Sequence, residues 1–291
     1  MKFIELICYL LNYKGKEFFK KQKHYHLNKI SNGCVNFYKT EFWKDDDESS
    51  TFYIEKSGSF LNRLKNAINF FNCYFEKEDF TNKIVLEIGT GRGTNILFLS
   101  KYSKAKFIYG VEISPRAANF SRKMLKDHKI TNAEIICRDM ASVPEIKDNS
   151  VDLIISIAAF EHIMDLKAVL EESFRILKSG GIVYSSFSPI WRHYYGSHLG
   201  KEIPFPWTHL IFSEPTVRKT LERLQGKSQK SLLYEGLNKL TLADYKRIIK
   251  STSFKSYKIY QTSSHPIKKI IKNIPIFNEY FAGSINIVLE K

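Results

Sequence analysis

Three glycines at alternate positions form the part of the sequence best suited to bind a ligand. They are Gly89, Gly91 and Gly93. The run before them, 83–88, is apolar and β-branched, and the segment after them, 94–101, has the spacing of a helix. This order predicts a strand, a tight turn and a helix. Because glycine has no Cβ, such a turn lets a ligand reach backbone N–H groups near the helix N-terminus.

Acidic residues follow the strands predicted on either side of this turn. Glu87 lies near the end of the first strand, and Glu112 ends the second strand, 107–111. An acid at the second position can accept hydrogen bonds from both hydroxyls of a ribose. Asp139 follows the third predicted strand, 133–137. Since the carboxyl ends of parallel strands meet at one edge of a sheet, these acids and the glycine turn indicate a ligand that contains a nucleoside.

The elements that position these residues alternate between strand and helix. Ser114 and Pro115 have the pattern of an N-cap and a first helical turn, and 178–181 is typical of a C-cap and a turn into the fifth strand. The predicted strands are 83–88, 107–111, 133–137, 151–156, 182–187, 256–261 and 284–289, and the predicted helices are 94–101, 115–126, 166–177 and 241–251. This alternation predicts an α/β fold that binds its ligand at the carboxyl ends of the strands.

The pattern E-x-G-x-G-x-G at 87–93 resembles the S-adenosylmethionine loop of class I methyltransferases, and 80–190 resemble their small-molecule (type 11) branch. The resemblance implies S-adenosylmethionine as cofactor and a Rossmann-like, seven-stranded, mostly parallel sheet with an antiparallel last strand beside the fifth. It also implies that Asp139 contacts the adenine amino group. The residues assigned to the cofactor are Glu87, Gly89, Thr90, Gly91, Gly93, Glu112, Ile113, Asp139, Met140 and Ser156. A nicotinamide cofactor stays open as the alternative.

An aromatic segment after the fifth strand is expected to select the methyl acceptor. Residues 188–212 contain three histidines, two tryptophans and two tyrosines. Apolar walls with a few polar groups are typical of a small-molecule pocket, although such a segment can also be a proline-rich lid that packs on the core. A hydroxyl acceptor needs a base, and histidine titrates near neutral pH. His198 and His209 are the first candidates for this catalytic role, and His162 is the next.

Glu161 and His162 also suggest a different chemistry. Metal-assisted O-methyltransferases carry E-x-x-E-H after the fourth strand, whereas this chain has Ala158 at the first acid position. We therefore expect no metal, because many metal-free relatives keep the Glu-His pair. His198 or His209 could still supply a missing ligand, which keeps the metal hypothesis open.

The charge of the chain does not by itself indicate nucleic acid. The net charge is +15 over 291 residues, but the lysines are spread along the chain and are interrupted by acids, as at 45–48. No single basic stripe is visible, so we expect a small-molecule acceptor and no nucleic-acid partner.

Cysteines and apolar segments restrict the class of protein further. Four scattered cysteines have no C-x-x-C spacing, which argues against a zinc knuckle and a disulfide scaffold. The apolar patch at 3–11 is too short to span a bilayer, and no cleavage site follows it. These features predict a cytoplasmic protein with no transmembrane segment. They do not indicate an oligomeric state.

Four regions follow from these assignments. We expect a partly helical N-terminal extension at 1–82 with a helix at 60–75, a cofactor-binding core at 83–187, an acceptor-pocket insertion at 188–240, and a C-terminal completion of the sheet at 241–291. The predicted function is methyl transfer from S-adenosylmethionine to a small-molecule or glycan-type acceptor, at oxygen. The alternatives are an RNA methyltransferase and a catalytically silent cofactor-binding partner protein.

Overall fold

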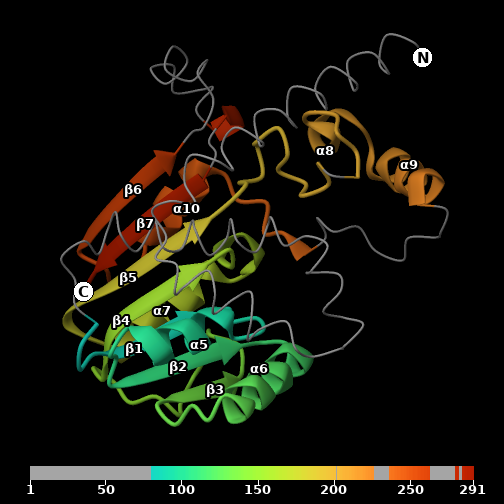
Figure 1. The fold of residues 1–291 in the computed structure, drawn as a ribbon. Coiled ribbons are helices and arrows are strands. Elements are labelled where there is room, and N and C mark those ends of the chain that lie inside the picture. Colours follow the sequence, from blue (N-terminus) through green and yellow to red (C-terminus); the bar gives the residue numbers. More distant parts are fainter. Residues whose placement is uncertain (1–79, 201, 226–235, 263–278, 282–283) are drawn as a thin grey trace, which may run out of the picture. The chain divides into compact units, whose positions relative to one another are not determined.

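A computed structural model describes residues 80–200, 202–225, 236–262, 279–281 and 284–291 (Figure 1). The helix expected at 60–75 and most of the N-terminal extension lie outside these residues. The proposed division into four regions therefore stays a prediction.

The described residues form one seven-stranded sheet with the strand order β3-β2-β1-β4-β5-β7-β6 (Figure 1). Its strands are β1 (Ile84–Ile88), β2 (Phe107–Glu112), β3 (Ala133–Cys137), β4 (Val151–Ile157), β5 (Leu177–Phe187), β6 (Ser256–Thr262) and β7 (Ser284–Glu290). From β3 to β5 all neighbours pair in parallel, whereas β7 pairs antiparallel with both β5 and β6. The predicted sheet, including its antiparallel last strand beside the fifth, is confirmed.

The helices of the described residues are α5 (Thr94–Tyr102), α6 (Pro115–Asp127), the 3₁₀ turn η2 (Phe160–His162), α7 (Leu166–Ile176), α8 (Thr208–Ile211), α9 (Glu214–Gln225) and α10 (Leu242–Lys250). The helices α5, α6, α7 and α10 pack against the sheet, whereas α8 and α9 belong to the insertion after β5 (Figure 1). The predicted cap of α6 is confirmed, since the Ser114 hydroxyl accepts the Ala117 N–H at 3.4 Å. The short α8 and α9 were not predicted. Within the described residues, no helix is long and apolar enough to cross a membrane.

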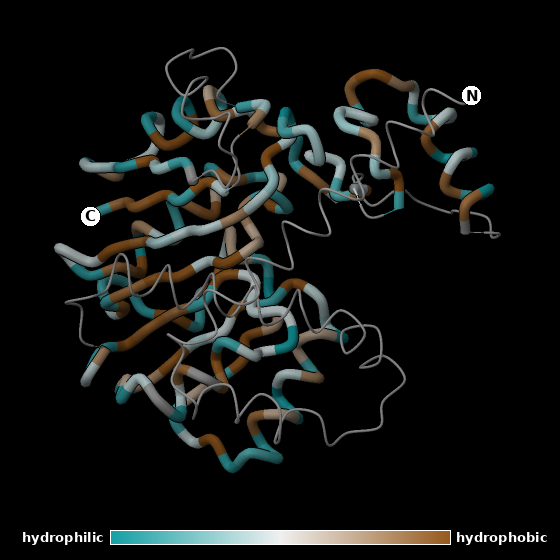
Figure 2. Tube along the Cα trace, turned by 45° about the horizontal axis from the view of Figure 1, so that its top comes forward, coloured by the Kyte–Doolittle hydropathy of each residue, from teal (hydrophilic) through white to brown (hydrophobic). Residues whose placement is uncertain are grey.

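The main hydrophobic core lies between the sheet and the helices α7 and α10. Brown, hydrophobic stretches follow the central strands in Figure 2. Phe160, Phe187 and Tyr245 are almost fully buried there, with neighbouring ring centroids 5.0–5.9 Å apart. The insertion has a second, smaller core of its own, made of Leu199, Ile203, Val217, Leu221 and Leu237. This second core gives α9 a buried face.

The sequence prediction was wrong at 178–181. These residues do not form a C-cap and a turn, because α7 ends at Ile176 with Leu177 as its C-cap and β5 begins at Leu177. The register with β4 shifts between Val151 and Leu153, which accommodates the extra residues as an irregularity within β5. Two backbone hydrogen bonds with Lys291 hold this stretch in the sheet. The Gly180 N–H donates to the Lys291 carbonyl, and the Lys291 N–H donates to the Gly181 carbonyl, both at 3.1 Å.

Candidate active site

The glycine turn joins β1 to α5 in the conformation that its composition requires. Gly89, Gly91 and Gly93 have φ angles of 70°, 56° and 73°, in the left-handed region that residues with a side chain rarely adopt. The N–H groups of Gly89 and Thr90 both donate to the Val111 carbonyl, at 2.9 and 3.2 Å. The turn is therefore attached to the end of β2.

The glycines of this turn have different surroundings. A Cβ at Gly89 would lie 2.6 Å from the Cβ of Ala159, so close packing with the chain after β4 requires glycine there. A Cβ at Gly91 would have no neighbour within 4 Å. The missing side chain of Gly91 thus leaves open space for a ligand, while its carbonyl accepts the Ser121 hydroxyl at 2.8 Å.

Glu112 faces this turn from the end of β2. Its Oε2 accepts the Gly91 N–H at 2.7 Å, and its Oε1 accepts the Ser114 N–H at 2.9 Å. An ionised carboxylate has about four lone-pair positions, so each oxygen can accept a further hydrogen bond. The structure brings together the glycine turn and the acid that we assigned to the ribose.

Glu87 lies under the turn and is almost completely buried. It accepts hydrogen bonds from the Thr90 hydroxyl at 2.8 Å and from the Asn95 side-chain amide at 2.6 Å. Burial raises the pKa of Glu87 to about 7, and the nearby Glu112 adds to this rise, whereas the two hydrogen bonds oppose it. The sequence analysis did not identify Asn95 as a partner of Glu87, although a residue in the first turn of α5 lies close to the end of β1.

The loops after β2 and β3 supply the apolar part of the site. Ile113 is 66% exposed directly beside Glu112, while Met140 is buried. Asp139 is exposed, and its Oδ1 accepts the Ala141 N–H at 2.9 Å. The Arg138 N–H donates to the Glu112 carbonyl at 3.1 Å, so the two loops are adjacent. An exposed isoleucine beside an acid is a suitable surface for a flat ring that carries a ribose.

Ser156, like Glu87, lies inside the protein. It is fully buried in β4, and its hydroxyl donates to the Ile88 carbonyl of β1 at 3.3 Å. The side chain supports the pairing of the two central strands and exposes no surface to a ligand. Its assignment as a cofactor contact stays a prediction.

Asn238 holds the turn that follows β4. Its side-chain amide donates to the carbonyls of Phe160 and Ile163 at 2.6 and 3.0 Å, and its backbone N–H donates to the Glu161 carbonyl at 2.9 Å. The Tyr245 hydroxyl also donates to the Phe160 carbonyl, at 3.3 Å. Sequence reasoning missed Asn238, because no local pattern connects it to a turn 78 residues earlier.

Glu161 lines a small hollow between this turn and the insertion. The hollow is partly open to solvent and has room inside for about one water molecule. Pro189, Trp191, Lys239 and Tyr245 also line it, and the Lys239 ammonium lies 5.4 Å from the centre of the Trp191 ring. Glu161 itself is 4% exposed. The role of the insertion as an acceptor pocket stays a prediction.

The structure brings two of the three candidate histidines together. The rings of His162 and His198 lie 5.6 Å apart, edge to face. His162 Nδ1 lies 3.0 Å from the Gly236 carbonyl, and His198 Nε2 lies 3.4 Å from the Pro189 carbonyl. Because a carbonyl only accepts, these nitrogens carry the protons in the neutral rings. The second nitrogen of each ring is then the basic one.

His209 lies elsewhere in the insertion, against Trp191. Their ring centroids are 4.4 Å apart, and His209 Nε2 donates to the Trp191 carbonyl at 2.6 Å. Burial lowers the pKa of His209, so the ring is neutral at physiological pH. Its Nδ1 is buried and has no hydrogen-bond partner among the described residues. The catalytic roles of all three histidines stay predictions.

Metal ligation has no ready site in the part of the chain that the structure describes. There, no group of three or more His, Cys, Asp and Glu side chains could hold an ion. Glu161 is buried in the hollow, whereas the adjacent His162 is exposed beside His198.

Comparison with known proteins identifies the central part of the chain. Residues 86–185 match a family model described as a methyltransferase domain. A stretch of 78 residues is 33% identical to a tRNA (guanine-N(7)-)-methyltransferase of Lactobacillus johnsonii, and covers 26% of this chain and 36% of that protein. A stretch of 117 residues is 31% identical to protein arginine N-methyltransferase 8-B of Danio rerio, and covers 39% of this chain and 27% of that protein. The similarity thus spans about a third of these relatives' length.

Solved structures share the fold at low sequence identity. One is a putative S-adenosylmethionine dependent methyltransferase from Listeria monocytogenes, with a TM-score of 0.52 and 16% identity over 79% of this chain and 98% of that one. Another is a putative sarcosine dimethylglycine methyltransferase from Galdieria sulphuraria, with a TM-score of 0.51 and 15% identity over 78% and 86% of the two chains. These similarities support the Rossmann-like arrangement of the sheet.

Proposed function

Because the chain carries a class I methyltransferase domain at residues 86–185, we propose that it is an enzyme that uses S-adenosylmethionine to methylate an acceptor. One observation carries this proposal. The Glu112 carboxylate, the open space beside Gly91 and the exposed Ile113 lie together at the ends of β1 and β2. A ribose and the ring attached to it need these three features.

The residues present fit the cofactor. Glu112 would accept hydrogen bonds from the ribose hydroxyls, and Ile113 and Met140 would contact the adenine ring. Asp139 would accept a hydrogen bond from the adenine amino group. The bound cofactor supplies an electrophilic methyl group on its sulfonium. The protein must therefore align the acceptor and exclude water, since little further activation of the methyl group is needed.

The proposed acceptor is a small molecule or a glycan-type molecule, methylated at oxygen. The support is the aromatic insertion after β5, which carries Trp191, His198 and Trp207. A hydroxyl acceptor loses its proton as it attacks, and the imidazoles of His162 and His198, whose rings lie 5.6 Å apart, are the candidates to take it. His209 is less suited, because its second nitrogen is buried.

Titration with S-adenosylhomocysteine tests the cofactor site. Glu112→Gln removes the charge and keeps the shape, and we expect its affinity to fall at least tenfold, since hydrogen bonds to charged groups contribute about 1.5–3 kcal/mol. Glu134→Gln is the matched control, because Glu134 is an exposed acid on the neighbouring β3. Equal affinity of wild type and Glu112→Gln, measured by calorimetry with both proteins folded, would show that the assignment of the site is wrong.

Turnover of the histidine variants tests the base. We expect His162→Ala or His198→Ala to lower kcat by about a hundredfold with little change in cofactor affinity, and a chelator to leave activity intact. His128→Ala is the control, because His128 lies at the surface beside Lys101. Restoration of a chelated enzyme by magnesium or manganese would favour the metal hypothesis. Full turnover in both His162→Ala and His198→Ala would leave positioning alone to explain the reaction.

RNA is a second candidate acceptor, favoured by the net charge of +15 and by the similarity to a tRNA methyltransferase. If the charge only reflects composition, binding to a structured RNA should be weak and should disappear near physiological salt, because the salt competes with phosphate contacts. Tight binding at 150 mM salt would favour RNA. Cofactor binding without methyl transfer to RNA or to a metabolite extract would indicate a silent partner protein.

A further inference from the structure

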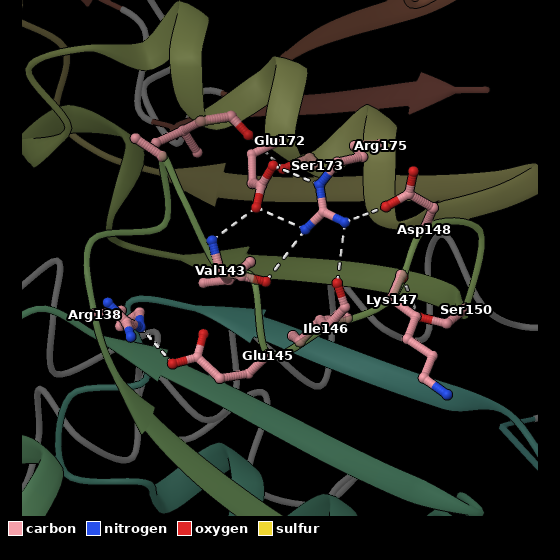
Figure 3. A network of polar contacts seen from close by, with 12 residues as sticks. Arg138, Val143, Glu145, Ile146, Lys147, Asp148, Ser150, Glu172, Ser173 and Arg175 are labelled. Carbon is pink, nitrogen blue, oxygen red and sulfur yellow. Dashed lines mark hydrogen bonds and ion pairs between the residues drawn. The ribbon is translucent and has the colours of Figure 1, made fainter.

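The loop that carries Asp139 is fastened to α7 by a network of charged hydrogen bonds (Figure 3). The loop spans 138–150, between β3 and β4. Its backbone at Val143 is held on both sides: the N–H donates to Glu172 Oε1 at 2.7 Å, and the carbonyl accepts from Arg175 Nη2 at 3.2 Å. Glu172 and Arg175 belong to α7, so these bonds fix the position of the loop relative to this helix.

The two α7 side chains are joined by two hydrogen bonds. Arg175 donates to both oxygens of Glu172, each at 2.8 Å, and its Nη1 reaches the Ile146 carbonyl at 3.0 Å and the Asp148 carboxylate. The hydrogen bonds from Arg175 lower the pKa of Glu172. The Glu172 side chain is only 12% exposed. Arginine suits this position because its rigid fork binds one carboxylate through two parallel bonds.

The same loop contains a second ion pair that does not involve α7. Arg138 bonds to Glu145, and both side chains are about half exposed. An exposed pair of this kind contributes little to stability or position. The contrast identifies the Glu172–Arg175 pair as the anchor of the loop.

From these contacts we infer that Glu172 and Arg175 are positioning residues for recognition of the cofactor's purine amino group. Val143 lies four residues after Asp139, and Met140 and Val143 are both buried. The buried residues and the α7 pair leave the short turn at Asp139 little freedom to shift. A hydrogen bond weakens steeply when its geometry changes, so a small displacement of the loop would weaken selection for adenine. This inference rests on the proposed function.

A pair of ligands that differ at one group tests the inference. S-adenosylhomocysteine carries the amino group, and S-inosylhomocysteine has a carbonyl oxygen in its place. We expect the wild type to prefer the adenine ligand at least tenfold, and Glu172→Gln and Arg175→Lys to reduce this ratio to about threefold or less. Glu145→Gln is the matched control on the same loop and should keep the wild-type ratio. Calorimetry at a temperature where circular dichroism shows folded protein gives both affinities.

The ratio separates positioning from a general loss of structure, because a merely structural change would weaken both ligands equally. An unchanged ratio in a folded Glu172→Gln or Arg175→Lys protein would overturn the inference, as would a wild type that binds both ligands equally. If the wild type binds neither ligand, the proposed function fails instead. Glu172→Gln keeps the size of the side chain, so it provides the test if Arg175→Lys does not fold.

Discussion

Glu87 should make the stability of this protein depend on pH in a direction opposite to most acids. Its pKa rises from 4.5 to about 7 in the folded protein, chiefly through burial. An acid whose pKa is higher in the folded than in the unfolded protein stabilises the folded state as long as the acid is protonated. This contribution is fully present below about pH 4.5 and is lost as pH rises to about 7. At about 1.4 kcal/mol for each pKa unit, the loss is on the order of 3 kcal/mol.

Glu87→Gln isolates this effect, because glutamine has nearly the same shape and does not titrate. Urea unfolding at intervals from pH 4 to pH 8 gives the unfolding free energies of wild type and variant. We expect the difference between them to change by about 3 kcal/mol across this range, in favour of the variant at high pH. Glu134→Gln, at an exposed acid, is the control and should follow the wild type. Parallel curves for Glu87→Gln and wild type would refute the assigned pKa and its cause.

Two further predictions concern the chain segments that support the site. Gly89→Ala should reduce the unfolding free energy by about 2–4 kcal/mol, because it combines a φ of 70° with a Cβ 2.6 Å from that of Ala159. Adding Ala159→Gly removes the clash, so the double variant should recover only the part of the lost unfolding free energy that the clash caused. If denaturant unfolding shows no recovery in the double variant, this account is wrong. Asn238→Ala should cost about 2–3 kcal/mol, because it removes the amide that donates to the carbonyls of Phe160 and Ile163 and leaves the Phe160 carbonyl only its bond from the Tyr245 hydroxyl. Asn119→Ala, which removes an exposed contact with Arg122, should cost less than about 0.5 kcal/mol in the same assay, and equal losses would argue against a special role for Asn238.

The features that depend on neighbouring residues were predictable from the sequence. The turn at Gly89–Gly93 and the helix cap at Ser114 follow from backbone conformations and hydrogen bonds within a few positions. The parallel sheet follows from the alternation of apolar runs with helical spacing, because a parallel pair needs a crossover between its strands. The same reasoning placed Glu112 in the site, because an acid at the end of β2 has to lie at the carboxyl edge of the parallel sheet, where ligands bind.

The tertiary structure alone decided which distant residues meet. Asn238 holds a turn 78 residues earlier, and Arg175 anchors the loop at Val143 from 32 residues later. The pairing of His162 with His198 and the burial that raises the pKa of Glu87 likewise depend on the packed chain. No periodicity along the sequence records such contacts. They arise because buried polar groups must find partners wherever packing places them, and desolvation depends on all the atoms that surround a group.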